Sequence, residues 1–238
     1  MNRRKMLAAL AAGGSGLLEQ ESADVNQSLY IPKAQLVEDC NLLHDFMDEY
    51  SFVDLLTSSP TLRITHIPVL VDRTAGTYGK IFGHVSRQNP QSQTFDGRHT
   101  AVIVFRGPHG YISPTWYAKT DVVPTWNFAV VHATGRPQAV TETTALHNLL
   151  ARLIDKYESY QGSGYDFSKL PENFVSALMG GIVGFEMPIE LLEGKFKLGQ
   201  ERSEVDKQGV LEHLRQSARR ERSLVDFTAS FYKRPPQK

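Results

Sequence analysis

Residues 104–127 read VFRGPHGYISPTWYAKTDVVPTWN, and short extended runs flank them on both sides. The stretch holds both tryptophans of the chain and three of its twelve prolines. Proline fixes φ and removes a backbone donor, which suits irregular segments with side chains directed at a ligand. Aromatic faces mixed with hydroxyls and amides favour a planar heteroaromatic ligand with polar edges. The residues alone leave two interpretations open, a binding wall and a buried aromatic cluster that joins two strands.

Working outward from this stretch, short runs with strand character recur along the chain, separated by turn signals such as Asp96-Gly97. Parallel strands would need a crossover helix between each pair, so close spacing predicts an antiparallel barrel or sandwich. The predicted strands cover residues 52–57, 62–71, 81–85, 100–105, 126–136 and 182–193.

Four segments have helical character. Leu36, Cys40, Leu43, Met47 and Tyr50 recur at helical spacing and predict an amphipathic helix with Cys40 on its core stripe. The other three predicted helices are one capped by Thr141 and ending at Tyr157, one opened by Ser168 and Pro171 and ending at Met179, and one opened by Ser203 with Asp206. The basic run 215–222 continues the last helix and is interpreted as a solvated face, the alternative being contact with phosphates or a partner.

Composition bounds the class of protein. The chain has 238 residues with 26 basic and 26 acidic side chains, so its formal net charge is zero. Bulk electrostatics therefore give no indication of a nucleic-acid or membrane-surface protein. A single cysteine excludes an intramolecular disulfide. The eight histidines form no HxH or HExxH pattern, and we expect no metal site.

The first 18 residues, MNRRKMLAALAAGGSGLL, join a basic start to an apolar run too short to span a bilayer. Arg3 and Arg4, followed by Met6 and Leu7, resemble a twin-arginine export signal, although Asn2 and Met6 depart from its usual residues. Export by that route would place the protein in the periplasm. The alternative is an N-terminal extension on a cytoplasmic protein.

Two polar groups could bind an anion. Ser86-Arg87-Gln88-Asn89 follows a predicted strand and offers a guanidinium, a hydroxyl and two amides, which is the donor set a phosphate monoester needs. Residues 194–203, GKFKLGQERS, place cations and a glutamine just before a helix start, with a solvated linker as the alternative. No Gly-x-Ser-x-Gly elbow, phosphate-binding loop or Gly-x-Gly-x-x-Gly turn is present.

Several segments together resemble the PaiB family, described as FMN-binding negative transcriptional regulators. The segments are LYIPK from Leu29, THIPVLVD from Thr65, GHVSRQNPQ from Gly83, GPHGYISPTWY and VPTWNF in the opening stretch, AVVHATGRP from Ala129 and IVGFEMPIELLEGKFKL from Ile182. The resemblance implies a mainly β fold with peripheral helices (α+β), a six-stranded antiparallel split β-barrel of the FMN-binding type. It also implies a homodimer with FMN in the interface groove. The implied organisation is an extension at 1–28, the barrel domain at 29–214 and a basic helix or tail at 215–238.

The resemblance also implies positions for the cofactor-binding residues. Thr65, His66 and Pro68 would lie along the flavin, while Ser86, Arg87 and Asn89 would hold or adjoin its phosphate. Tyr111, Ser113, Trp116, Thr125, Trp126 and Asn127 would close on the ring or the ribityl chain. Lys195, Lys197, Gln200 and Arg202 match the tail of the family, where Gly199 replaces a serine and Glu201 an asparagine, and of these Lys197, Gln200 and Arg202 would contact the cofactor.

FMN carries its own two-electron reactivity, so the chain needs no catalytic triad, and the sequence names no catalytic residue. The first functional hypothesis is a flavin-dependent redox protein or flavin reductase acting on a small molecule, with a nicotinamide electron donor. The second is a DNA-binding repressor, which the zero net charge and the absence of a recognisable helix-turn-helix disfavour. The third is a haem-binding split barrel, which would leave Ser86 and Arg87 without a role.

Overall fold

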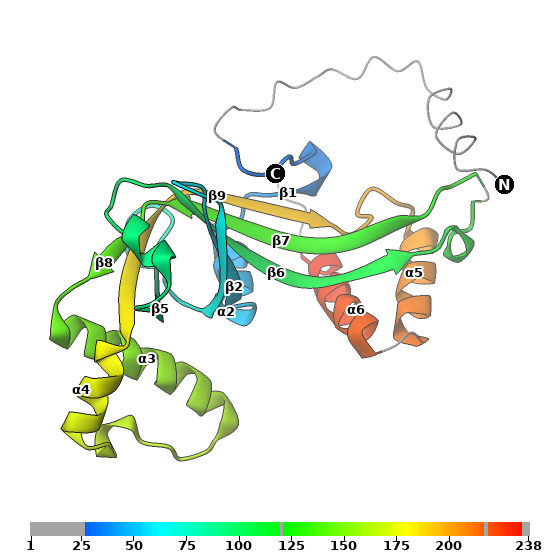
Figure 1. Ribbon diagram of the computed structural model, residues 1–238. Helices are drawn as coiled ribbons and strands as arrows, with labels where there is room; N and C mark the ends of the chain where they lie inside the picture. Colours follow the sequence, from blue (N-terminus) through cyan, green and yellow to red (C-terminus); the bar gives the residue numbers. More distant parts are fainter. Residues whose placement is uncertain (1–26, 120, 217–218, 235–238) are drawn as a thin grey trace, which may run out of the picture.

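The computed structural model describes residues 27–119, 121–216 and 219–234 (Figure 1). Strands in this part of the chain pair antiparallel in one curled sheet with the order β3-β2-β6-β7-β9-β5-β4, and β1 and β8 also pair with β9. The strands are β1 (Leu36–Val37), β2 (Phe52–Thr57), β3 (Arg63–Pro68), β4 (Leu70–Asp72), β5 (Lys80–Ser86), β6 (Ala101–Ile112), β7 (Thr125–Gly135), β8 (Gln138–Val140) and β9 (Ile182–Lys197). The predicted antiparallel sheet is confirmed, and six of these strands are longer than three residues.

The opening stretch is mostly sheet. The predicted strand at 100–105 continues to Ile112 as β6, and β7 begins at Thr125, with Tyr111 opposite Trp126 across the pair. A β-bulge between Arg106 and His109 interrupts the ladder. At the bulge, a Cβ on Gly107 would lie 2.6 Å from the ring of Phe46, so only glycine fits there. Glycine and proline at positions 107–110 hide this strand from sequence patterns, since both are rare inside strands.

The helices are α2 (Cys40–Glu49), α3 (Thr143–Gln161), α4 (Glu172–Gly180), α5 (Glu204–Gln216) and α6 (Arg219–Tyr232). Short 3-10 turns are η1 (Lys33–Gln35), η2 (Pro90–Thr94), η3 (Pro114–Trp116) and η4 (Phe167–Lys169). Helices α2, α5 and α6 lie on one side of the long strands β6, β7 and β9, whereas α3 and α4 lie at the end of the sheet formed by β5, β8 and the start of β9 (Figure 1). No helix among the described residues combines the length and apolar character needed to cross a bilayer.

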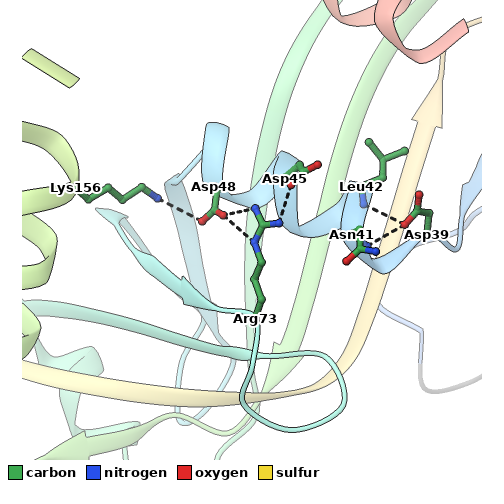
Figure 2. Close-up of polar contacts among 7 residues, drawn as sticks. All are labelled: Asp39, Asn41, Leu42, Asp45, Asp48, Arg73 and Lys156. Atoms are coloured by element: carbon green, nitrogen blue, oxygen red, sulfur yellow. Dashed lines mark hydrogen bonds and ion pairs between the residues drawn. The ribbon is translucent and has the colours of Figure 1, made fainter. Parts of the chain in front are cut away.

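The first predicted helix starts later than its apolar pattern suggests. Leu36 belongs to β1, and α2 begins at Cys40 because the carboxylate of Asp39 accepts from the backbone N–H groups of Asn41 and Leu42 at 2.9 and 3.2 Å (Figure 2). Cys40, at the first helical position, is therefore half-buried rather than part of the core. Likewise Glu142, not Thr141, caps α3 through the N–H groups of Thr144 and Ala145.

Charged side chains join α2 to two other parts of the fold. Arg73, in the turn after β4, donates to Asp45 at 2.7 Å and to Asp48 at 2.5 and 3.1 Å, and Lys156 of α3 lies 3.7 Å from Asp48 (Figure 2). The two aspartates raise the pKa of Arg73, while burial lowers the pKa of Lys156. This network holds the β4–β5 turn and α3 against the solvent side of α2.

Aromatic rings form the core between the sheet and its helices. Phe196 of β9 is fully buried, and its ring centroid lies 5.1 Å from those of Phe46 in α2 and Phe227 in α6. Helix α6 also contributes Leu224 and Val225 to the same core. The export-signal motif at residues 2–7 lies outside the described residues, as do Ser217 and Ala218 of the basic run.

We expect Phe196→Ala to lower the free energy of unfolding by about 3–5 kcal/mol, because it leaves a cavity where three aromatic rings meet. Chemical denaturation followed by circular dichroism measures this loss. Phe174→Ala, at a side chain that is 51% exposed, is the matched control and should change little. An equal loss in the two variants would contradict the central position of Phe196.

Candidate functional site

Among the described residues, no α-helix lies on the face of the long strands opposite α2, α5 and α6 (Figure 1), and we call it the open face. Strand register places large apolar side chains on it, among them Phe52, Ile64, Tyr111 and Trp126, which are 69%, 52%, 43% and 51% exposed. Soluble monomers seldom expose so many large apolar groups on one surface, so this face fits a ligand or a partner.

Five of the predicted cofactor residues lie on the open face. They are His66, Pro68, Tyr111, Trp126 and Lys197. Tyr111 and Trp126 pack edge to face with ring centroids 6.2 Å apart. His66 hydrogen-bonds through Nδ1 to Oδ1 of Asp54 at 2.5 Å. Lys197 donates to the hydroxyl of Thr125 at 2.7 Å, which keeps its cation at the end of β7.

Thr65 and Asn89 form a separate network, because strand alternation turns Thr65 away from the open face. The Thr65 hydroxyl donates to Oε1 of Gln91 at 2.5 Å and accepts from Nδ2 of Asn89 at 2.9 Å. Gln91 is fully buried and donates to the carbonyl of Leu55 at 3.0 Å. Sequence reasoning did not single out Gln91, although it ends the GHVSRQNPQ motif.

Ser86 and Arg87 are exposed at the end of β5. Arg87 donates through Nε to the carbonyl of Gly180 at 2.6 Å and through Nη2 to that of Ile182 at 2.8 Å, so it also caps the C-terminal end of α4. No hydrogen bond uses its Nη1 within the described part of the chain. The Ser86 hydroxyl accepts from the N–H of Gln88 at 3.3 Å and keeps its own proton to donate.

The segment between β6 and β7 packs on helix α5. Ser113 caps the turn η3, and the Trp116 ring stacks on His213 at 5.3 Å with an interplanar angle of 13°. A Cβ on Gly209 of α5 would lie 2.4 Å from the carbonyl oxygen of Trp116, so glycine is required for this contact. Trp116 therefore has a packing partner within its own chain, and Asn127 is 3% exposed.

The tail after β9 is held by its own hydrogen bonds. Gln200 accepts from the N–H of Leu198 at 2.9 Å and donates to the carbonyl of Phe196 at 2.7 Å, and the Arg202 guanidinium lies 4.9 Å from the Tyr117 ring centroid. Gly199 stands where the family has serine, and its φ of 74° is a conformation that glycine adopts without strain. The substitution thus suits the turn as it is built here.

The N-terminal end of the described chain crosses the open face over β7 and β9. The Ser28 hydroxyl donates to Oε2 of Glu193 at 2.7 Å and lies 2.9 Å from Nδ1 of His132, and Lys195 donates to the carbonyl of Tyr30 at 2.7 Å. Glu193 is 4% exposed, and its Oε1 has no partner among the described residues. Sequence reasoning missed this cluster because its members are distant along the chain.

The predicted site residues form two groups that one chain keeps apart. Thr65 is opposite Leu55 of β2, and Leu55 is opposite Ile103 of β6. Tyr111, which is opposite Trp126, lies eight residues after Ile103 along β6. At about 3.3 Å per residue this separation is roughly 25 Å. Residues 86–89, which are predicted to bind the phosphate, belong to the first end. Residues 125–127 and 197–202 belong to the second end.

Comparison with known proteins gives a consistent result. Residues 29–191 match the family described as "Putative FMN-binding domain". The chain is 34% identical over 187 residues to "Protease synthase and sporulation protein PAI 2" of Bacillus subtilis (strain 168), covering 78% of this chain and 89% of that one. It is also 30% identical over 198 residues to an uncharacterized protein of Aspergillus fumigatus, covering 64% of this chain and 76% of the other.

Two solved structures share the fold. The flavocytochrome Anf3 from Azotobacter vinelandii has a TM-score of 0.55 and 11% identity, with 75% of this chain and 78% of that chain covered. The FAD and heme binding protein from Mycobacterium smegmatis has a TM-score of 0.54 and 10% identity, with 73% and 78% covered. These similarities concern the fold alone and confirm the predicted split barrel.

We expect the protein to lose stability as the pH falls through the ordinary range of histidine. Burial lowers the pKa of His84 and of His132, although Glu193 acts in the opposite direction on His132. Below about pH 6.5 the unfolded chain therefore binds more protons than the folded one, and the free energy of unfolding falls with falling pH. Urea unfolding at a series of pH values measures the slope.

His84→Leu should flatten that slope, because the buried Nδ1 of His84 has no partner among the described residues. His109→Gln, at an exposed ring, is the matched control. If His84→Leu and His109→Gln keep the slope of the unaltered protein, burial of His84 does not contribute to it.

Proposed function

The chain belongs to the PaiB family of FMN-binding domains, and from this premise we propose that it is a flavin-dependent redox protein that acts as a homodimer. It would reduce a small molecule with electrons from a nicotinamide donor. The observation that carries this proposal is the separation of the two groups of site residues, one at the Thr65–Asn89 end of the sheet and the other at the Tyr111–Trp126 end, roughly 25 Å apart along β6. A second copy is what can bring one group of each chain beside the other group of its partner.

The donors at the first end fit a flavin phosphate. Arg87 retains its Nη1 donors after serving two carbonyls, and Ser86 retains a hydroxyl proton on an exposed loop. A phosphate dianion is bound best by such a guanidinium with neutral donors beside it. The carbonyl contacts fix the guanidinium before a ligand arrives, which lowers the entropy that binding would cost.

The second end fits a ring system. Trp126 is 51% exposed and held edge to face by Tyr111, so it can present an ordered flat surface. Lys197, fixed by Thr125, offers a cation for the polar edge of a flavin. FMN supplies the two-electron chemistry when bound, and the chain has to bind it, orient it and exclude water.

The open face also suits association of two copies. Phe52, Ile64, Tyr111 and Trp126 would be removed from water, and a two-fold axis makes the same surface serve both partners. Face-to-face packing on a two-fold axis that runs across the strands would place the phosphate end of one copy toward the ring end of the other. Each dimer would then hold two equivalent cofactor sites.

Purified protein is expected to be yellow, with flavin absorption that bleaches when NADH or NADPH is added without oxygen. The measurement is an absorbance spectrum before and after the addition. Flavin bands that persist with both donors would rule out the nicotinamide donor, and a Soret band in place of flavin bands would favour the haem-binding alternative.

Subunit mixing tests the shared site. Arg87→Ala damages the phosphate end and Trp126→Ala the ring end, so neither homodimer should retain FMN after gel filtration. Random assembly of the two variants restores one intact site in each heterodimer, and roughly a quarter of all sites should then bind FMN. Fluorescence of released flavin measures this recovery.

Melting curves of the separate variants are the control, since Arg87 also caps α4. Failure of the mixture to recover FMN, with both variants folded and exchanging subunits, would contradict a site built from two chains. Recovery above the random fraction would contradict equal assembly of the dimers.

A further inference from the structure

Three charged side chains meet on the open face across strands β3, β2 and β6. Asp54 is directly opposite His66 across the β2–β3 pair and opposite Val104 across the β2–β6 pair, and Arg106 follows two residues after Val104. The Asp54 side chain is 15% exposed, whereas those of His66 and Arg106 are 59% and 64% exposed. The largely buried carboxylate of Asp54 therefore lies between two exposed side chains, those of His66 and Arg106.

Each oxygen of the Asp54 carboxylate has its own partner. Oδ1 lies 2.5 Å from Nδ1 of His66, and Oδ2 lies 2.7 Å from Nη2 of Arg106. A carboxylate beside Nδ1 assigns the ring proton to that nitrogen and fixes the orientation of the imidazole. Nε2, at the other end of the ring, has no partner within the described residues and belongs to an exposed side chain.

The cluster has the arrangement that proton transfer requires. A carboxylate behind an imidazole holds the ring in one tautomer and stabilises the imidazolium. Arg106 balances the carboxylate charge from the other side, so that the negative charge on this apolar face is compensated.

We propose that His66, held in place by Asp54, is the proton donor of the flavin site, serving acceptors whose carbonyl oxygen must be protonated, such as quinones. This inference rests on the proposed function. When bound, anionic reduced FMN would supply the hydride and be oxidised to FMN, and the acceptor would take that hydride with its electron pair. One acceptor oxygen takes the proton from Nε2 of the imidazolium. His66 is left neutral and regains a proton from water.

The charged groups that face His66 define the pH dependence. They are Asp54 on β2 and Arg106 on β6, and the next strand, β7, carries His132, which is occupied by Ser28. The rate at which 1,4-benzoquinone oxidises the reduced, FMN-loaded protein should fall as the pH rises, because the step consumes a proton held at Nε2. Stopped-flow absorbance of the flavin measures that rate.

His66→Gln should slow the oxidation about 10²-fold at neutral pH and remove the pH dependence, with rescue by added imidazole. Asp54→Asn should slow it less and shift the profile, as expected of a positioning residue. Glu190→Gln breaks a comparable exposed ion pair, with Arg136 at 2.7 and 2.9 Å, and should change nothing. A pH profile that His66→Gln leaves unchanged would overturn the proposal.

A second readout does not depend on turnover. Diethyl pyrocarbonate should modify His66 at Nε2 in the full-length apoprotein, as detected by mass spectrometry, and saturating FMN should slow that modification several-fold. Equal labelling with and without FMN, when the spectrum shows that FMN is bound, would overturn the placement of His66 at the flavin. Absence of FMN binding would instead contradict the proposed function, and the two failures are therefore distinguishable.

Discussion

One-sided coverage of the long strands is the constraint on which the structure depends. Phe196 of β9 is buried against Phe46 and Phe227, so α2 and α6 are drawn to the same face of the sheet. Two glycines of the sheet allow α2 to pack closely on this face. A Cβ on Gly107 would collide with Phe46, and a Cβ on Gly194 would collide with Leu43. Because α2, α5 and α6 all pack on one side of the long strands, the other side of these strands keeps exposed aromatic and charged groups.

The open face then sets what the protein can do. A surface with Trp126 and Phe52 exposed is costly in water unless a ligand or a second chain covers it. The same surface holds ordered polar groups, such as Asp54 between His66 and Arg106, whose geometry is fixed before any ligand binds. Preorganised groups on a hydrophobic surface are what a cofactor site needs, because binding then orders few side chains.

Much of the fold could be predicted from sequence because alternation and turn signals are local. The strands at 52–57 and 126–136 were placed to within about a residue at each end, and the family motifs indicated the split barrel and FMN. The extension of β6 to Ile112 could not be predicted, since Gly107 and Pro108 break the pattern that identifies strands. The starts of α2 and α3 were not predicted correctly. Asp39 and Glu142 cap these helices, and neighbouring residues could have served as caps equally well by sequence alone.

The site was less predictable than the fold, because its contacts join residues far apart in the chain. Thr65 and His66 are adjacent in the motif, yet the strand turns them to opposite faces, one toward Gln91 and the other toward Asp54. Arg87 was recognised as a cation, but its contacts with Gly180 and Ile182 depend on where α4 ends. Long-range pairing of this kind has no signature in a single sequence.

The bulge in β6 has a consequence for the unpaired edge of that strand. Strand β2 pairs with β6 only as far as Val104, so the stretch from Phe105 to Ile112 is a free edge within the described structure. Such an edge invites strand addition and aggregation, but Pro108 offers no N–H there and the bulge breaks the ladder. Edge-to-edge polymerisation through this part of β6 is therefore disfavoured, although the strand is long and has no strand partner on that side among the described residues.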